Sequence, residues 1–156
     1  EHELECCSNQ LDNVINKITE KTIVEIMKIK NPNQTIFEIV KLFLLITDSL
    51  EYNESFNWAS FQNRKLDINI IKKNLFEIKT KNLNKDYIDE TIKITFNYNE
   101  IYISMNKINK SMVLILDLLK YVVDFAIKKN MKETIQQTNI NVIHLFNFFI
   151  ENAKIE

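Results

Sequence analysis

The chain has 156 residues, the length of one ordinary domain, so the sequence gives no reason to expect a second folded unit. Apolar residues make up 46% of it and charged residues 26%, and no apolar run is long enough to span a bilayer, which together predict a globular protein without a membrane span. The formal net charge of −1 excludes a long-range electrostatic attraction to nucleic acid or to an anionic membrane.

The first residues predict a reduced, intracellular protein. Residues 1–5 are acidic and lack the basic and apolar regions of a signal peptide. Cys6 and Cys7 are adjacent, and a bond between neighbouring residues closes too small a ring to staple a fold.

The first predicted helix ends near Lys30. Its apolar residues recur every three or four positions, in a stripe narrow enough for a coiled-coil seam: Leu11, Val14, Ile15, Ile18, Ile23, Ile26 and Ile29. The only proline of a chain without glycine, Pro32, removes a backbone donor and disfavours the α conformation at Asn31, so we expect the helix to break there.

A second helix is predicted from about Gln34 to Thr47, with Asn33 or Thr35 as its N-cap. Apolar residues cover more than half of its circumference, which is typical of a helix inside a bundle. Three short helices follow: a turn around Trp58 and Phe61, residues 70–78, and residues 85–96. A single tryptophan between two helices favours a structural role, in which Trp58 fixes a loop to the bundle.

The last segment, residues 106–153, has an almost unbroken apolar period and predicts one very long helix, or two helices end to end. The first 30 residues and residues 127–156 could then form two equal arms, each about 45 Å long at roughly 1.5 Å per residue. If these arms pair antiparallel, residue 13 lies opposite His144.

The order of these motifs resembles the stalk tip, or microtubule-binding domain, of dynein heavy chains. The segment IVEIMKIKNP (23–32) is similar to the end of the family's first arm, and IFEIVKLFLLI (36–46), followed by Trp58, is similar to its Leu-rich helix and tryptophan. The segments IKKNLFEIKTKNLN (71–84) and NKSMVLILDLLKYV (109–122) are similar to two later helices. The resemblance covers about residues 23–127, and Asp48 stands where the family has glycine.

The resemblance implies an all-α fold in which a small helical bundle caps a two-stranded antiparallel coiled-coil stalk. It divides the chain into arm 1 (residues 1–30), a microtubule-binding head (31–125) and arm 2 (126–156). In the family, a distant AAA+ ATPase ring changes the register of the two arms and thereby the affinity of the tip for microtubules. The implied partners are tubulin and the rest of the heavy chain, and the implied location is the cytoplasmic cytoskeleton or a cilium.

The resemblance places the tubulin contacts on the first helix of the head, the third helix and the start of the sixth. Basic residues on these elements complement the acidic surface of tubulin, and Phe37 lies among them either as a core residue, which its helical spacing favours, or as an exposed anchor. The candidate contacts are Phe37, Lys41, Arg64, Lys65, Lys72, Lys73, Lys107 and Lys110. The alternative for each lysine is that it simply belongs to a solvent-exposed face of mixed charge and contacts no partner.

No catalytic or cofactor site is expected. His2, Cys6, Cys7 and His144 have zinc-compatible side chains, but their spacing is poor for a tetrahedral site. The acidic cluster at residues 86–90 is explained by a helix N-terminus, and Ser111 has no histidine or aspartate nearby in sequence for nucleophilic catalysis. The chain also lacks the Gly-rich phosphate loop of an ATPase.

Two alternatives remain open. Polar residues interrupt the predicted seam and could either select a register or be tolerated there: Asn13, Thr22, Gln136, Thr138 and Asn139. A free-standing helical adaptor that offers a groove to a partner helix is the second functional interpretation.

Overall fold

The computed structural model describes residues 2–51 and 53–155, and for residues 154 and 155 only the backbone. This part of the chain forms eight α-helices and no β-strand, which confirms the predicted all-α class. The helices are α1 (His2–Lys17), α2 (Glu20–Met27), α3 (Gln34–Ile46), α4 (Trp58–Gln62), α5 (Ile68–Glu77), α6 (Lys85–Thr95), α7 (Tyr98–Ile108) and α8 (Lys110–Ile155). The outer ends of the two predicted arms, residues 1 and 156, lie outside the described residues.

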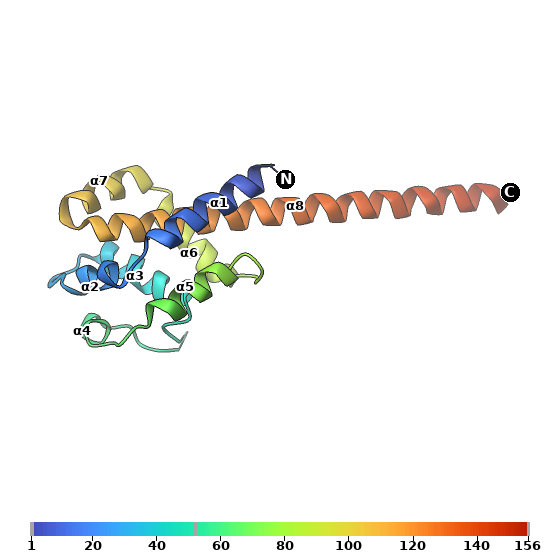
Figure 1. Cartoon of the computed structure of the whole chain (residues 1–156). Coiled ribbons are helices and arrows are strands. Elements are labelled where there is room, and N and C mark those ends of the chain that lie inside the picture. Colours follow the sequence, from blue (N-terminus) through green and yellow to red (C-terminus); the bar gives the residue numbers. More distant parts are fainter. Residues whose placement is uncertain (1, 52, 156) are drawn as a thin grey trace.

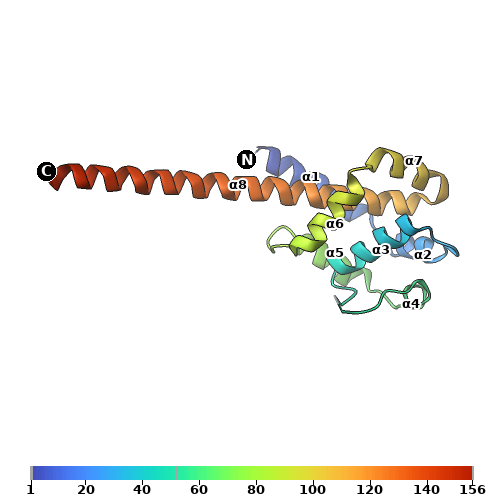
Figure 2. The same ribbon diagram turned by 180° about the vertical axis from the view of Figure 1, so that it is seen from behind.

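One long helix, α8, runs the length of the molecule. The helices α2–α7 surround its N-terminal half, and its C-terminal half projects from this bundle (Figure 1). The helix α1 lies beside the N-terminal half of α8 and runs in the opposite direction, as the view from behind also shows (Figure 2). Where the bundle ends, α8 continues alone.

The helix α3 forms the centre of the bundle, as its apolar sequence predicts. Its N-cap is Asn33, whose Oδ1 accepts from the backbone N–H of Ile36 at 2.9 Å, and eight of its residues are buried. The helix ends in a Schellman arrangement, in which the N–H of Ser49 donates to the carbonyl of Leu44 at 2.8 Å. Asp48 adopts the left-handed conformation there, with φ of 55°.

The predicted first arm is not one helix. It breaks at Ile18–Thr19, because Thr19 and Thr22 form a capping box: Thr19 Oγ1 accepts from the Thr22 N–H, and the Thr19 N–H donates to Thr22 Oγ1. Thr22 is therefore a capping residue and not a polar interruption of a seam. The apolar stripe continues across the break because Ile18 is fully buried, which hides the break from a periodicity argument.

The predicted pairing of residue 13 with His144 is wrong. Lys128 donates to Glu3 at 2.9 Å, and Ser111 donates to Glu25 at 2.7 Å, so residues 3–25 lie along residues 111–128 of α8. The two arms are therefore not of equal length: the described part of α1 reaches only the middle of α8, and His144 lies on the projecting half. An additional helix, α7, forms between the two segments predicted to be helical at residues 85–96 and 106–153.

The projecting half of α8 carries many exposed apolar side chains. They are Met131, Ile135, Ile140, Val142, Ile143, Leu145, Phe146, Phe148, Phe149 and Ile150. Even so, no helix among the described residues is both long and apolar enough to cross a bilayer.

Asp124 is a half-buried carboxylate near the contact between α8 and α1. Burial raises the pKa of this carboxyl, and the opposing attraction of Lys120 and Lys128 is weaker. A folded-state pKa above the unfolded value means that the fold favours the neutral form, so this contribution is present at acidic pH and lost as the pH rises through the folded pKa.

We therefore expect Asp124→Asn to raise the free energy of unfolding at pH 7, where the wild-type carboxylate is charged. The advantage should shrink as the pH falls below the unfolded pKa near 3.8, where the wild-type carboxyl is protonated in both states. Urea unfolding of both proteins at several pH values measures this difference. A variant that is less stable than wild type at pH 7 would show that the lysines, and not burial, dominate at this site.

Candidate binding surface

Two basic segments meet at the end of the bundle opposite the projecting half of α8 (Figure 1). One is the α2–α3 connection with Lys28 and Lys30, and the other is the α7–α8 corner with Lys107 and Lys110. All four lysines are exposed. Residues 26–33 and 101–116 contain no aspartate or glutamate, so neither segment offsets its own positive charge.

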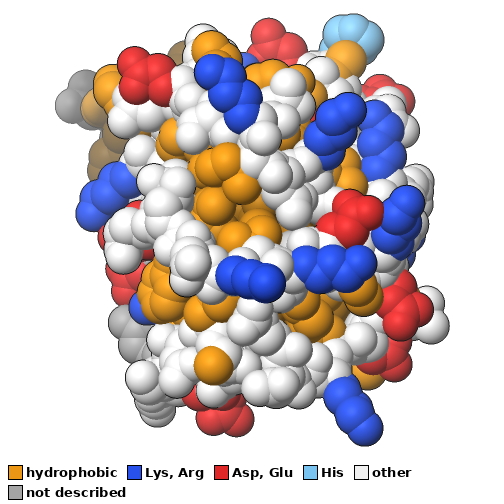
Figure 3. Space-filling model, turned by 90° about the vertical axis from the view of Figure 1, so that its left-hand side faces the viewer, with side chains coloured by type: hydrophobic (Ala, Val, Ile, Leu, Met, Phe, Trp, Pro, Cys, Tyr) orange, Lys and Arg blue, Asp and Glu red, His pale blue; other side chains and the backbone are white. Residues whose placement is uncertain are grey.

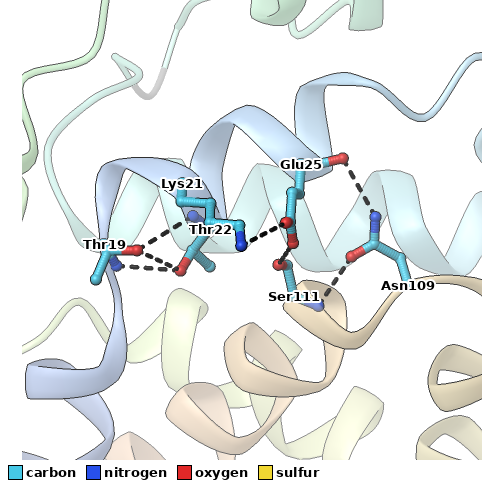
Figure 4. Close-up of polar contacts among 6 residues, drawn as sticks. All are labelled: Thr19, Lys21, Thr22, Glu25, Asn109 and Ser111. Carbon is cyan, nitrogen blue, oxygen red and sulfur yellow. Dashed lines mark hydrogen bonds and ion pairs between the residues drawn. The ribbon is translucent and has the colours of Figure 1, made fainter.

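A polar clasp joins the two segments (Figure 4). The side-chain amide of Asn109 donates to the backbone carbonyl of Glu25 at 3.2 Å, and the Ser111 hydroxyl donates to the Glu25 carboxylate at 2.7 Å. The same Asn109 caps α8, because its Oδ1 accepts from the N–H of Ser111 at 2.8 Å. The end of α2 is thereby fixed to the start of α8, and their lysines belong to one surface.

The loop that carries Lys28 and Lys30 is also held from α4. Trp58 Nε1 donates to the carbonyl of Ile29 at 2.8 Å, and Gln62 Nε2 donates to the carbonyls of Met27 and Ile29 at 2.8 and 3.1 Å. These donors satisfy backbone acceptors that the end of α2 leaves unpaired. Trp58 thus has the structural role that the sequence favours, and it fixes the backbone from which two lysines project.

The charge of this surface is positive. The part of the chain that the structure describes contains no ion pair to Lys28, Lys30, Lys107 or Lys110. The carboxylate of Glu25 accepts a hydrogen bond from Ser111 and forms an ion pair with Lys21 at 3.8 Å. Viewed end on, this side of the molecule shows apolar surface bordered by lysine side chains (Figure 3). Such a surface attracts acidic partners, mainly by accelerating association, and salt weakens the attraction.

The structure places the predicted contact residues on several different surfaces. Lys107 and Lys110 belong to the basic end. Arg64 donates to the carbonyl of Ser49 at 2.6 Å and pairs with Glu54, and Lys72 donates to the carbonyl of Asn16 at 3.4 Å. These last two cations are engaged within the fold, and their role as partner contacts stays a prediction.

The other four predicted contacts have different surroundings. Phe37 is half-buried against Phe56, with ring centroids 4.7 Å apart, which agrees with its interpretation as a packing residue. Lys41 lies at a groove between α3 and α6 whose lining includes four acidic side chains and a second lysine, Lys93. Lys65 is exposed beside a hollow next to α2, and Lys73 is exposed on α5.

Sequence reasoning missed Lys28 and Lys30. Both fall on the segment that ends the first predicted arm, which was assigned to the stalk and not to the head. The sequence contains no distinguishing signal for them, because other acid-free segments also carry basic residues, at 55–66, 68–76 and 125–132. What the sequence does not contain is the clasp through Glu25 that makes the two pairs neighbours.

Metal binding and nucleophilic catalysis find little support among the described residues. Cys6 and His2 lie 3.8 Å apart on α1, but no group of three or more His, Cys, Asp or Glu side chains there is arranged to hold a metal ion. Ser111 donates to the carboxylate of Glu25, and no histidine forms a hydrogen bond with it among the described residues. Comparison with known protein families, curated proteins and solved structures finds no match to this chain.

Proposed function

We propose that the chain is the microtubule-binding tip of a dynein stalk, attaching a motor reversibly to tubulin. The observation that carries this proposal is the basic surface of Lys28, Lys30, Lys107 and Lys110 at one end of the bundle, with the long α8 leaving from the other end. One end is suited to an acidic partner, and the other is suited to a connection with a larger protein.

The end of α3 supports the resemblance independently of its apolar pattern. The family has glycine after the Leu-rich helix, and this chain has Asp48 at that position. Asp48 adopts a left-handed conformation, with φ of 55°, which is the conformation for which glycine is normally preferred. Aspartate tolerates this conformation better than most residues, so the departure from the family pattern can preserve the backbone.

The coiled-coil stalk is part of the proposal. The projecting half of α8 carries exposed apolar residues at successive spacings of four, seven, three and four residues: Met131, Ile135, Val142, Leu145 and Phe149. A helix running antiparallel to α8, in line with α1, would bury this stripe. In this arrangement the two arms carry the signal from a distant ATPase ring, and the tip itself has no turnover.

The capping box at Thr19 bears on how such a signal could reach the basic surface. The helix α1 ends before the box, while α2 is held to the start of α8 through Glu25. A displacement of α1 along α8 would therefore act on α2 through a short non-helical link. In this proposal the register of the two arms sets the affinity of the tip for tubulin. The proposed location is the cytoskeleton or a cilium.

Cosedimentation with stabilised microtubules across a salt series tests the proposal. We expect saturable binding that weakens as salt rises, because the contacts are exposed lysines screened over about 8 Å at physiological ionic strength. Circular dichroism on the same sample establishes that the fragment is folded. Absence of binding at low salt, both in the folded fragment and in fragments with α1 and α8 locked in alternative registers by disulfides, would reject the proposed function.

A helical adaptor is the second candidate, and one observation favours it. The groove between α3 and α6 has a volume of about 670 Å³, and its lining combines Leu42, Leu45, Tyr87 and Ile94 with four acidic side chains and two lysines, Lys41 and Lys93. Such a groove could hold a partner helix with basic flanks. Asp89→Asn together with Glu90→Gln, at two exposed positions of the lining, would weaken binding to a partner of this kind and leave microtubule binding unchanged.

A further inference from the structure

A small apolar hollow lies between α2 and the link that joins α4 to α5. Its volume is about 230 Å³, and its apolar lining consists of Ile23, Val24, Met27, Leu66 and Ile68. This is below the roughly 300–1,000 Å³ of pockets that enclose drug-sized ligands, so the hollow is suited to a single side chain. Val24 is 42% exposed, which leaves its apolar surface open to a partner.

Positive charge surrounds this hollow on two sides. Lys21, Val24 and Lys28 recur at three- and four-residue spacing along α2, so they share one face of the helix. Arg64 and Lys65 lie on the opposite rim. Arg64 pairs with Glu54 and Lys21 with Glu25, so Lys28 and Lys65 are the cations without an ion pair in this part of the described structure. The only acidic residue in the lining is Glu20, at the start of α2. An apolar side chain that enters the hollow is therefore accommodated best when acidic residues flank it.

The hollow is continuous with the basic end of the bundle. Met27 lines the hollow, its carbonyl accepts from Gln62, and Lys28 follows it directly. Interfaces commonly combine an apolar centre with a charged rim, and a few anchored apolar residues supply most of the affinity. The lysines provide attraction without much selectivity, while a hollow of defined size can distinguish one side chain from another.

We propose that this hollow is an apolar subsite of the binding surface, which takes one aliphatic side chain from an acidic segment of the partner. The partner is recognised by a branched aliphatic residue flanked by carboxylates. The inference rests on the proposed function for the identity of the partner, since tubulin is the acidic protein proposed there. The subsite itself is defined by the residues of α2 and of the α4–α5 link.

The test uses two short polyglutamate peptides that differ only in a central leucine or alanine. Binding to the intact chain is measured by fluorescence anisotropy at low salt. We expect the leucine peptide to bind about tenfold more tightly, because burial of the larger aliphatic side chain adds favourable apolar contact. Equal affinity for the two peptides would overturn the proposal.

Two matched variants locate the preference. Val24→Trp fills the hollow and should reduce the leucine-to-alanine ratio to about one, while the lysines still hold both peptides. Ile92→Trp, at a position on α6 of nearly the same exposure (39%), should keep the ratio of the wild-type chain. A preference that survives Val24→Trp, or that is lost equally in Ile92→Trp, would place the contact elsewhere and overturn the proposal.

Microtubule cosedimentation of the same proteins separates this inference from the proposed function. Selective peptide binding that depends on Val24, in a chain that does not bind microtubules, would support the subsite and reject tubulin as its partner. Microtubule binding without any leucine preference would support the proposed function and overturn the subsite.

Discussion

Replacing Leu119 by alanine is expected to lower the free energy of unfolding by about 2–5 kcal/mol, a large part of the stability of a domain of this size. Leu119 is fully buried on α8, where the bundle packs around that helix. The substitution removes apolar contacts and leaves a cavity that its neighbours fill only in part. Urea unfolding followed by circular dichroism measures the loss.

The same substitution on the projecting half of α8 provides the control. Leu145 belongs to the same helix but is 56% exposed, so Leu145→Ala should change the stability of this fragment by no more than about 0.5 kcal/mol. If Leu145→Ala destabilises the fragment as much as Leu119→Ala does, the projecting half must pack against another element. In a longer protein in which a second arm covers this stripe, Leu145→Ala should become destabilising, which provides a test of the stalk itself.

Reversing the charge of Lys28, Lys30, Lys107 and Lys110 together should weaken microtubule binding at least about tenfold, equivalent to roughly 1.4 kcal/mol. All four lysines are exposed and form no ion pair with another described residue, so the fold itself should tolerate the change. Reversing only Lys107 and Lys110 should give a smaller loss in the same direction. Cosedimentation measures affinity, and thermal unfolding checks the fold.

A control with similar chemistry lies on α6. Lys85 and Lys93 are exposed, away from the basic end, and their reversal to glutamate also makes the chain more acidic. We expect this pair to affect microtubule binding much less than reversal of Lys107 and Lys110. An equal loss of microtubule affinity on reversing either lysine pair would mean that net charge alone governs binding. That result would reject the assignment of the basic end as the contact surface.

Local sequence rules predicted the individual elements well. Asn33 was one of two predicted caps of α3, the helix around Trp58 and Phe61 was expected, and the bounds of α6 differ from the prediction by one residue. These features depend on interactions within a few residues, such as a cap, a proline or an apolar period. The helix break at Thr19 was not predicted, because Thr–x–x–Thr is a weaker capping signal than a box with glutamate. The buried side chain of Ile18 also continues the apolar stripe across the break.

By itself, the sequence determined an all-α domain with a proline-marked break, a buried central helix and a long final helix. Only the tertiary structure decided that α1 pairs with the N-terminal half of α8, since an apolar seam repeats along the helix and permits several registers. It alone joined residues 25 and 111, 86 positions apart, because a hydrogen bond between distant residues depends on how the helices pack and leaves no periodic trace in the sequence.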